Sequence, residues 1–505
     1  MKGDSFLPYP ELFDLLRDLL HGSGQVYLVG GAVRDILLDR PTHDLDFVLK
    51  GDVKAAAKTV ADTLSASLYV LDNERNTYRV IYYQKDGSRI LLDFAALRAD
   101  DLESDLRGRD FTINAIALDP SSPDKLIDPL RGEQDLQNKL LRACSPTSFI
   151  DDPARVLRGV RLGMDLGFNI LPDTFSAMRM SADLLGHVAA ERRRDELFKM
   201  LDGSRLDQAV SMLEQLGALN EILPELAELK GVTQSPPHIL DVWEHTLSVL
   251  HELSCLFSAI VVGNNTAESS TNPIMRLTLQ KLGRFLDRLK EHFSGQLNPE
   301  RSRISLLALA ALYHDIAKPA TYRVDPDGRI RFFDHDKIGA IVAARRGHEL
   351  ALSQVEIQYL ETTVRHHMRP HFLEMSGDAL TRRAIYRFFK DTGDVGVDIC
   401  LLSLADVLAT YGPTIPEEHW ISKLDICQTL LTAWWDRPTD VVRPIRLLTG
   451  DDLQVYFALT PGRLIGEILE ALREAQACGE ISNRGEAMKF VQSWLETNGK
   501  MSVKG

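Results

Sequence analysis

The chain contains 505 residues, of which 44% are hydrophobic and 26% charged, as in an ordinary soluble globular protein. This length is too great for one hydrophobic core, so about three or four domains are expected. The net charge of −14 argues against unselective coating of nucleic acid, although a local basic surface can still bind RNA. The five cysteines are scattered, which predicts a reducing, cytoplasmic location and no disulfide framework.

No membrane segment is expected. The longest largely apolar run, Ile304 to Tyr313, is too short to span a bilayer and leads into His314 and Asp315. The segment from Met1 to Pro10 lacks the apolar core of a signal peptide.

A pair of glycines follows the first predicted strand. The apolar run Gln25–Val29 predicts a strand, Gly30 and Gly31 end it, and a helix is predicted to begin near Val33. This order places free backbone N–H groups beside a helix N-terminus, an arrangement that binds phosphate groups. We therefore expect a triphosphate to bind here.

Two acids alternate along the next predicted strand, Asp44–Leu49. The two-residue period of a strand puts Asp44 and Asp46 on one face, close together. Two adjacent carboxylates repel each other unless a divalent cation lies between them, so the pair predicts a metal site. Asp93, near the end of the predicted strand Arg89–Phe94, is the candidate for a third acid that orients an attacking hydroxyl group. A single Asp is more often a solvated strand end, but a pair after two glycines favours a phosphoryl- or nucleotidyl-transfer site.

The rest of the chain divides into a mixed region and a helical region. Further strands are predicted at Ser67–Leu71 and Thr77–Tyr83, and the pattern from Asp151 onward is helical almost throughout. Three features punctuate the helical region: a proline-rich boundary at 234–237, a polar insertion at 263–273 and a linker at 437–444.

Two polar blocks follow the predicted acids. Residues 107–115 combine cations, an acid and an amide at an apolar helix start, and residues 151–161 begin a helix with two acids and a proline. In that helix Arg155, Arg158 and Arg161 recur every three residues and so lie along one side. Such a row is commonly a salt-bridged surface, but after a metal–triphosphate site we interpret it as an anion-binding wall.

These motifs, in this order, resemble those of class II tRNA nucleotidyltransferases, the CCA-adding family that also contains bacterial poly(A) polymerases. The resemblance covers residues 25 to about 200. It is carried by Gly30-Gly31-Ala32-Val33-Arg34-Asp35, Asp44-Leu45-Asp46, Arg109-Asp110-Phe111-Thr112-Ile113-Asn114-Ala115, Asp128-Pro129 with Gly132 and Asp135-Leu136, Asp151-Asp152-Pro153-Ala154-Arg155 with Arg158 and Arg161, and Glu191-Arg192.

The resemblance implies roles for individual residues. Asp44 and Asp46 are expected to hold two magnesium ions, with Asp93 as the third catalytic acid. The expected nucleotide-binding residues are Gly30, Gly31 and Arg34 at the glycine pair, Arg109 and Asn114 near the sugar and phosphates, Asp152 and Arg155 at the base edge, and Arg158 and Arg161 at the triphosphate. An Asp and an Arg one helical turn apart offer an acceptor and a donor fork, which match the Watson–Crick edge of C or A without a template.

The segment between the third acid and Arg109, residues 94–108, is short. Full CCA-adding members of the family usually carry a longer flexible loop here, which helps the switch from C to A, and a short loop is typical of CC-adding relatives. The expected activity is addition of CCA, or part of it, to the 3′ end of tRNA from CTP and ATP. The presence of all other family motifs favours complete CCA; CC addition alone and poly(A) synthesis are the alternatives.

A second metal site is predicted in the helical region. His245, His314-Asp315 and Asp406 match the pattern of an HD domain, the metal-dependent phosphohydrolase superfamily, over residues 236–410. Imidazole and carboxylate ligands favour a divalent transition metal. Further candidate ligands are His335 and His366-His367. A phosphohydrolase with an RNA-recruiting head is therefore a competing function. A non-catalytic RNA-binding scaffold is disfavoured, because unused paired acids would only cost stability.

The expected fold class is an α+β multidomain protein, with a polymerase-beta-like head of mixed sheet and helices followed by all-α domains. The expected domains are a nucleotidyltransferase head at 1–145, a helical neck at 146–230, an HD domain at 231–436 and a helical tail at 437–505. The tail resembles the region of HD-bearing family members that is thought to contact tRNA. The alternative interpretation is a capped helical hairpin in which Gly450 stops a helix.

Overall fold

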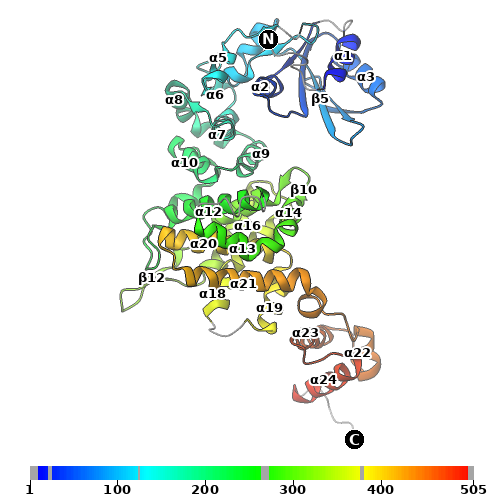
Figure 1. Ribbon diagram of the computed structural model, residues 1–505, viewed down its shortest axis with the longest axis vertical. Helices are drawn as coiled ribbons and strands as arrows, with labels where there is room; N and C mark the ends of the chain where they lie inside the picture. The colour runs from blue at the N-terminus through cyan, green and yellow to red at the C-terminus, as the bar shows by residue number, and fades with distance from the viewer. Residues whose placement is uncertain (1–8, 21–24, 123–124, 263–271, 376–379, 499–505) are drawn as a thin grey trace. The chain divides into compact units, whose positions relative to one another are not determined.

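The computed structural model describes the chain except for residues 1–8, 21–24, 123–124, 263–271, 376–379 and 499–505 (Figure 1). The predicted polar insertion at 263–273 therefore lies almost entirely outside the described residues. The chain forms two compact units: Met1–Glu196 with Met212–Ile222, and Leu197–Ser211 with Leu223–Gly505. We call them unit 1 and unit 2.

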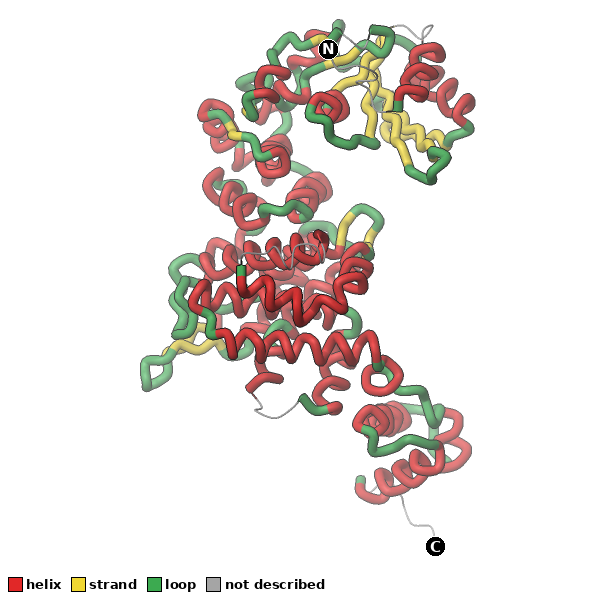
Figure 2. Tube along the Cα trace, in the orientation of Figure 1, coloured by secondary structure: helices red, strands yellow, loops and turns green. Residues whose placement is uncertain are grey.

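Unit 1 is built on a seven-stranded mixed sheet with strand order β3-β4-β5-β2-β1-β6-β7 (Figure 2). The strands are β1 (Gln25–Val29), β2 (Asp44–Lys50), β3 (Ser67–Asp72), β4 (Thr77–Tyr83), β5 (Arg89–Ala96), β6 (Ala117–Leu118) and β7 (Leu126–Ile127). Strands β2 and β5 run parallel, and the other neighbours run antiparallel. The five longer strands confirm the prediction, whereas β6 and β7 are too short for a two-residue period to reveal them.

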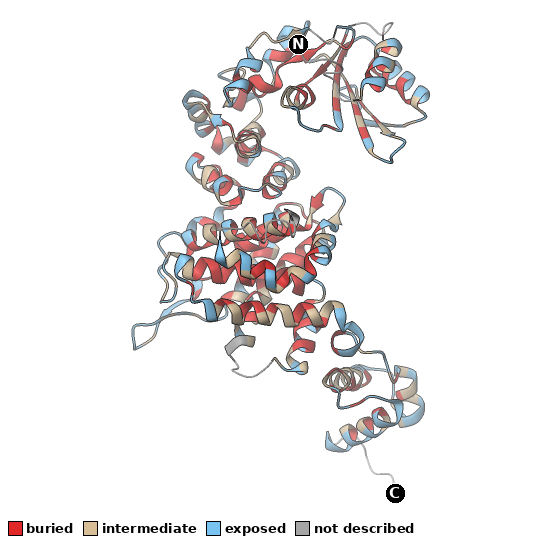
Figure 3. Cartoon of the chain, viewed as in Figure 1, coloured by how far each residue is buried: buried red, intermediate tan, exposed pale blue. Residues whose placement is uncertain are grey.

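The two faces of this sheet differ. Apolar side chains at alternate positions, such as Phe47 and Phe94, are buried, and helix α3 (Val53–Leu64) packs against β3, β4 and β5 (Figure 3). The intervening positions of β2 and β5 carry acids instead. Because neighbouring side chains along a strand point to opposite faces, all the acids of these two strands lie on the face away from the apolar layer.

Unit 1 contains further helices besides α3. They are α1 (Pro10–Leu20), α2 (Gly31–Leu37), α4 (Leu102–Arg107), α5 (Gly132–Gln137), α6 (Ser148–Asp151), α7 (Ala154–Leu166), α8 (Pro172–Met180), α11 (Leu219–Ile222) and the start of α9 (Ala190–Leu201), with a small pairing of β8 (Leu140–Leu141) and β9 (Asn169–Ile170). Helix α7 lies tightly on the block predicted at 107–115: a Cβ at Gly159 would come within 2.9 Å of Phe111 and 2.8 Å of Met178. That block forms a single helical turn, Thr112–Asn114, and not the longer helix that its apolar residues suggested.

Unit 2 is mainly helical, with buried residues running through its centre (Figure 3). Its helices are α12 (Val242–Val262), α13 (Pro273–Leu282), α14 (Leu286–Ser294), α15 (Arg303–Tyr313), α16 (His335–Glu349), α17 (Gln354–His366), α18 (Arg369–Met375), α19 (Arg382–Thr392), α20 (Val395–Tyr411) and α21 (Glu417–Asp436); α10 (Leu206–Leu216) belongs partly to each unit. Two hairpins interrupt the helices: β10 (Gln296–Asn298) with β11 (Arg301–Ser302), and β12 (Tyr322–Val324) with β13 (Ile330–Phe332).

Helix α20 is the central helix of unit 2. With the turn behind it, the segment Val395–Thr414 is long and apolar enough to cross a membrane, and it is the one such helix among the described residues. However, 83% of that segment is buried inside the protein, where α20 contacts α12, α17 and α21. This is the environment of a core helix. A search for uninterrupted apolar runs missed it because Asp398 and Asp406 divide its sequence.

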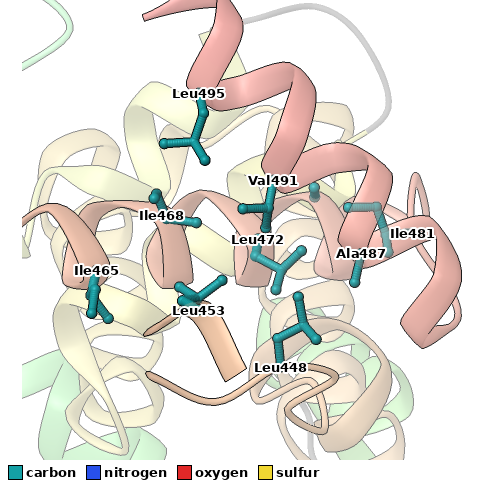
Figure 4. Close-up of a cluster of buried hydrophobic side chains, with 10 residues drawn as sticks. Leu448, Leu453, Ile465, Ile468, Leu472, Ile481, Ala487, Val491 and Leu495 are labelled. Carbon is teal, nitrogen blue, oxygen red and sulfur yellow. The ribbon is translucent and has the colours of Figure 1, made fainter. Parts of the chain in front are cut away.

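The C-terminal helices α22 (Gly450–Phe457), α23 (Arg463–Cys478) and α24 (Arg484–Thr497) enclose a small core of their own. Side chains from all three helices, including Leu453, Leu472 and Val491, point toward one another (Figure 4). The interpretation of Gly450 as a helix stop is wrong: Gly450 is the first residue of α22, which the Thr449–Asp452 capping box begins. The segment predicted as a linker at 437–444 includes a helical turn, Pro438–Val442.

Candidate active site and metal centre

The three predicted acids of the head lie together on the open face of the sheet. Asp44 and Asp46 occupy alternate positions of β2, and Asp93 of β5 is paired directly with Asp46 in the parallel register. Arg79, at the paired position of β4, donates from Nε and Nη2 to the two oxygens of Asp93, each at 2.8 Å. This bidentate pair holds the third acid in place. Sequence reasoning missed Arg79: it predicted the strand that carries this residue but not the pairing of that strand with the strand of Asp93.

The acids are crowded without a cation. Burial, the negative charge of Asp93 and that of Asp44 raise the pKa of the Asp46 carboxyl to about 6, against the lowering effect of Arg109. The ligands on offer are carboxylate oxygens, which magnesium prefers. The charge repulsion and the donor type together fit the predicted divalent metal.

The turn after β1 can be formed only by glycine. Gly30 has a φ of 75°, and a Cβ there would lie 3.3 Å from Nη1 of Arg109 and 3.4 Å from Oδ2 of Asp46. Helix α2 begins at the next residue, Gly31, close to the predicted start. The backbone of this turn thus lies directly against the metal site, where a side chain would block the approach of a phosphate.

A chain of polar contacts connects the glycine turn to α7. Arg34 donates from Nη1 to Oδ1 of Asn114 at 2.8 Å, and Asn114 donates from Nδ2 to Oδ1 of Asp110 at 3.0 Å. Asp110 is buried, which alone would raise its pKa. The charge of Arg158 and hydrogen bonds from Asn114 and the Phe111 N–H outweigh burial and lower that pKa below its usual range. Asp110 is therefore held as a carboxylate at the junction between the predicted sugar and triphosphate contacts.

The arginine row of α7 has a shared carboxylate partner. Arg158 donates from Nε and Nη2 to Oε1 of Glu196, and Arg161 donates from Nε to Oε2 of the same residue at 3.0 Å. Glu196 is buried on α9. The two arginines do lie on one side of the helix, as predicted. Sequence reasoning missed Glu196, which follows the Glu191-Arg192 signature by less than two helical turns.

The predicted base-reading residues are both engaged with other groups. The Asp152 carboxylate accepts two hydrogen bonds from Nη2 of Arg192, at 2.8 and 3.0 Å, whereas its distance to Nε of Arg155 is 3.9 Å. Arg155 instead donates to the carbonyls of Gly108 and Arg109 and to Ser148. A cavity of about 740 Å³ adjoins Asp152 and Arg192. Reading a base edge would require Asp152 and Arg155 to exchange these partners.

The short connection at 94–108 has hydrogen bonds within it and at its C-terminal end. Its helix α4 begins at an Asp101 cap, and the carboxylate of buried Asp105 accepts hydrogen bonds from the Arg98 N–H at 2.8 Å and from Nη2 of Arg109 at 3.0 Å. Arg155 holds the following residues through their carbonyl oxygens, at Gly108 and Arg109. These contacts join the C-terminal part of the segment to Arg109 and to α7.

Unit 2 brings the four predicted HD residues together in its core. Nε2 of His245, on α12, lies 3.0 Å from Oδ1 of Asp406, on α20, and 3.7 Å from Oδ2 of Asp315. Nε2 of His314 lies 3.1 Å from the same oxygen of Asp315. All four residues are buried. His245, His314 and Asp315 offer ligand atoms within 4.8 Å of one another, close enough to share one ion.

Asp315 also belongs to a second group. His335, at the start of α16, and His367, just after α17, place Nε2 atoms 3.4 and 3.9 Å from Oδ1 of Asp315. Burial, together with the charges of His335 and His314, lowers the pKa of His367 to about 3, so its ring stays neutral and able to bind a metal. Of the predicted pair His366-His367, only His367 belongs to this group.

Three residues near this cluster were not predicted. Nζ of Lys318 lies 2.6 Å from Oδ2 of Asp315, Nε2 of His371 lies 3.0 Å from Oδ2 of Asp406, and Nζ of Lys423 lies 3.1 Å from Nδ1 of His371. They line a cavity of about 480 Å³ together with Arg329, Arg331 and Phe332. Lys423 lies far from the His-Asp motif in sequence, so no local pattern could assign it to this site. Lys318 follows Asp315 by only three residues, and that spacing was the available signal.

The fold and these sites define a class of protein: a nucleotidyltransferase head with paired acids beside a glycine turn, on a chain that also carries an HD-type cluster. Family models agree. The model described as poly A polymerase head domain matches residues 26–142, that described as probable RNA and SrmB-binding site of polymerase A matches residues 167–230, and the HD domain model matches residues 277–411.

Similar proteins extend the match to nearly the full chain. An A-adding tRNA nucleotidyltransferase of Deinococcus radiodurans is 34% identical over 476 residues, covering 93% of this chain and 95% of the relative. A CC-adding tRNA nucleotidyltransferase of Thermus thermophilus is 33% identical over 475 residues, covering 92% and 93%. A solved structure of a CCA-adding enzyme with CTP has the same fold, with a TM-score of 0.61, 19% identity and 97% of each chain covered. The chain therefore belongs to the tRNA nucleotidyltransferase family.

Proposed function

We propose that this chain adds nucleotides to the 3′ end of tRNA and that it adds only part of the CCA sequence. The observation that carries the second statement is the short connection at 94–108, whose own Asp105 pairs with Arg109 and whose Gly108 accepts a hydrogen bond from Arg155. Switching from C to A requires the base pocket to change shape, and a short connection restricts that change. The two full-length relatives named above are each described by a single addition, A or CC. Complete CCA addition is the second candidate, favoured by the presence of every other family motif.

The head residues account for transfer chemistry. Asp44, Asp46 and Asp93 would hold magnesium. When bound, magnesium would lower the pKa of the RNA 3′-hydroxyl group and compensate the negative charge of the departing pyrophosphate. Arg79 keeps Asp93 oriented toward the other two acids. The glycine turn, Arg34, Arg109 and Asn114 lie beside the acids and fit the sugar and phosphates of an incoming nucleotide.

The base would be selected by Asp152 and Arg155 at the start of α7, and the triphosphate would lie along Arg158 and Arg161. A triphosphate would compete with Glu196 for these two guanidinium groups, and a base would compete with Arg192 for Asp152. Binding would therefore exchange existing ion pairs for new ones, which keeps each buried or half-buried charge compensated in both states.

The experiment that tests this function uses tRNA transcripts that lack CCA or end in C or CC. Each is incubated with CTP, ATP or both, and products are separated at single-nucleotide resolution. Addition of CC alone predicts that the transcript lacking CCA and the transcript ending in C are both extended to CC and no further. Addition of A alone predicts that only the transcript ending in CC is extended, by one A. Complete CCA formed from the transcript lacking all three nucleotides would refute partial addition, and continued A addition would indicate poly(A) synthesis.

For the HD cluster we propose a divalent transition metal held by His245, His314, Asp315 and Asp406. Buried imidazole and carboxylate groups in contact support this choice of metal class. Phosphohydrolysis is the second candidate activity of the chain, favoured by the cavity over this cluster, whose lysines and arginines suit a phosphate ester. Metal analysis of the purified protein tests the first statement, and release of inorganic phosphate from a nucleoside monophosphate tests the second.

We also propose a cytoplasmic location. The structure leaves all five cysteines as free thiols, which suits a reducing compartment. Fractionation of cells that produce the tagged chain would check it.

A further inference from the structure

The open face of the sheet in unit 1 continues well beyond the catalytic acids. In the strand register, Asp46 of β2 is paired with Asp93 of β5, Asp93 with Arg79 of β4, and Arg79 with Tyr69 of β3. Directly paired residues of neighbouring strands point to the same face. Tyr69 therefore lies on the catalytic face, at the edge strand, in line with the acids.

This edge of the face is exposed and rich in aromatic and basic side chains. Tyr69 is 52% exposed, and Tyr83, at the end of β4, is 62% exposed. Tyr83 is paired with exposed Arg89 of β5, so a second tyrosine–arginine pair repeats the arrangement of Tyr69 with Arg79. Large aromatic side chains exposed side by side with arginines are typical of surfaces that bind single-stranded nucleic acid.

The position of this surface relative to the acids indicates which part of the substrate binds there. The glycine turn of the predicted triphosphate site follows β1, on one side of β2, whereas β5, β4 and β3 lie in order on the other side. In nucleotidyl transfer the attacking and leaving oxygens lie roughly in line on opposite sides of the reacting phosphorus. If pyrophosphate leaves toward β1, the attacking RNA end approaches from the side of β5, β4 and β3.

We propose that the single-stranded 3′ end of the acceptor RNA binds across this face, with one base stacked on Tyr69 and another on Tyr83, and with Arg89 beside a phosphate. Tyr69 is three strands away from Asp46, which is about 14 Å at the usual strand spacing of about 4.8 Å. That distance corresponds to about four nucleotides at the stacked rise of about 3.4 Å, and to fewer in an extended strand. The stacked base thus lies a few nucleotides before the growing end. Stacking accepts any base, as an enzyme acting on many tRNAs requires.

This inference rests on the proposed function, because it names the surface that holds the acceptor. It is tested with the full chain and the variants Tyr69→Ala and Tyr83→Ala, by measuring KM for tRNA and for the added nucleotide separately. Loss of one base–aromatic stack, about 1–3 kcal/mol, predicts a rise in KM for tRNA of about 5- to 150-fold with an unchanged KM for the nucleotide. Both side chains are exposed, so the thermal unfolding midpoint should not change.

Matched variants separate stacking from other effects. Tyr69→Phe keeps the aromatic ring and should restore the KM for tRNA. Val70→Ser alters a neighbouring side chain of β3 that is 56% exposed on the opposite face, and should leave both KM values unchanged. A wild-type KM for tRNA in Tyr69→Ala would overturn the proposal, as would an equal rise for tRNA and nucleotide. Altered self-association in Tyr69→Ala would overturn it too, by assigning the face to a second copy of the chain.

A measurement of RNA binding tests the stacking surface separately from the proposed function. Fluorescence anisotropy with a labelled four-nucleotide RNA needs no turnover. Weaker binding by Tyr69→Ala than by Val70→Ser supports the stacking surface even if the wild-type chain extends none of the tRNA transcripts. Equal binding by both variants, in a chain that does extend tRNA, refutes the surface and leaves the proposed function intact.

Discussion

Replacing Asp46 by Asn is expected to abolish nucleotide transfer while making the metal-free head more stable. In the folded protein, burial and the charges of Asp93 and Asp44 raise the pKa of Asp46 from 3.8 to about 6. The folded state therefore binds this proton more tightly than the unfolded chain does. Below pH 3.8 the group is protonated in both states and has no effect. As pH rises toward 6 only the unfolded chain loses the proton, so the wild-type head loses stability, and above pH 6 the full penalty is present.

The size of the penalty follows from the shift. A difference of about 2 pKa units corresponds to about 3 kcal/mol, because each unit is worth about 1.4 kcal/mol. Asn has nearly the same shape and carries no charge. In the absence of magnesium, Asp46→Asn should therefore raise the free energy of unfolding of the head by about 2–3 kcal/mol at pH 8, and by almost nothing near pH 4. With magnesium added, the wild-type head should recover stability that the variant cannot.

The assay must report on the head alone. All five tryptophans, which are Trp243, Trp420, Trp434, Trp435 and Trp494, belong to unit 2, so tryptophan fluorescence does not follow the head. Pulse-labelling hydrogen exchange along a urea titration, read by mass spectrometry on the peptide containing β2, measures its unfolding directly. The titration is run in EDTA at several pH values between 4 and 8.

The matched control is Asp44→Asn, which removes the other carboxylate of the pair. The Asp44 side chain is exposed, so its replacement should stop transfer but change stability less than Asp46→Asn does. Equal stability of Asp46→Asn and wild-type protein at pH 8 without magnesium would refute the argument that carboxylate crowding defines this metal site. Near wild-type transfer by either variant would refute the metal assignment itself.

Three further outcomes are expected. Asp152→Ala should relax base choice more than it slows transfer, because we propose that this residue contacts the base and not the reacting phosphate. Product sequencing with each nucleotide checks this, and equal loss without misincorporation would contradict it. His314→Ala should leave tRNA tailing largely unchanged but remove the transition metal, as elemental analysis would show, whereas a folded variant that cannot tail tRNA would couple the HD site to the head. Glu356→Ala should lower the free energy of unfolding of unit 2 by about 3–5 kcal/mol, because it removes the carboxylate that pairs with the buried guanidinium of Arg301. Urea titration followed by tryptophan fluorescence measures this change, and a value below about 1 kcal/mol would contradict it.

The local parts of the head could be predicted because they depend on short-range periodicity. The two-residue alternation of β2 placed Asp44 and Asp46 on one face, and Gly30 marked a turn whose φ no other residue adopts easily. The HD cluster could be predicted because His245, His314-Asp315 and Asp406 match the pattern of an HD domain. The physical support from the sequence is the adjacency of His314 and Asp315, which lets both reach one cation.

Only the tertiary structure decided which groups those residues meet. Arg79 holds Asp93 because β4 pairs with β5, and Glu196 joins Arg158 to Arg161 because α9 packs against α7; neither contact leaves a pattern in the sequence. The alignment of Tyr69 with the acids likewise depends on strand order and register, which are set by pairing across the whole sheet. Sequence periodicity specifies the face on which a side chain lies, whereas hydrogen bonding and packing between distant segments specify its neighbours.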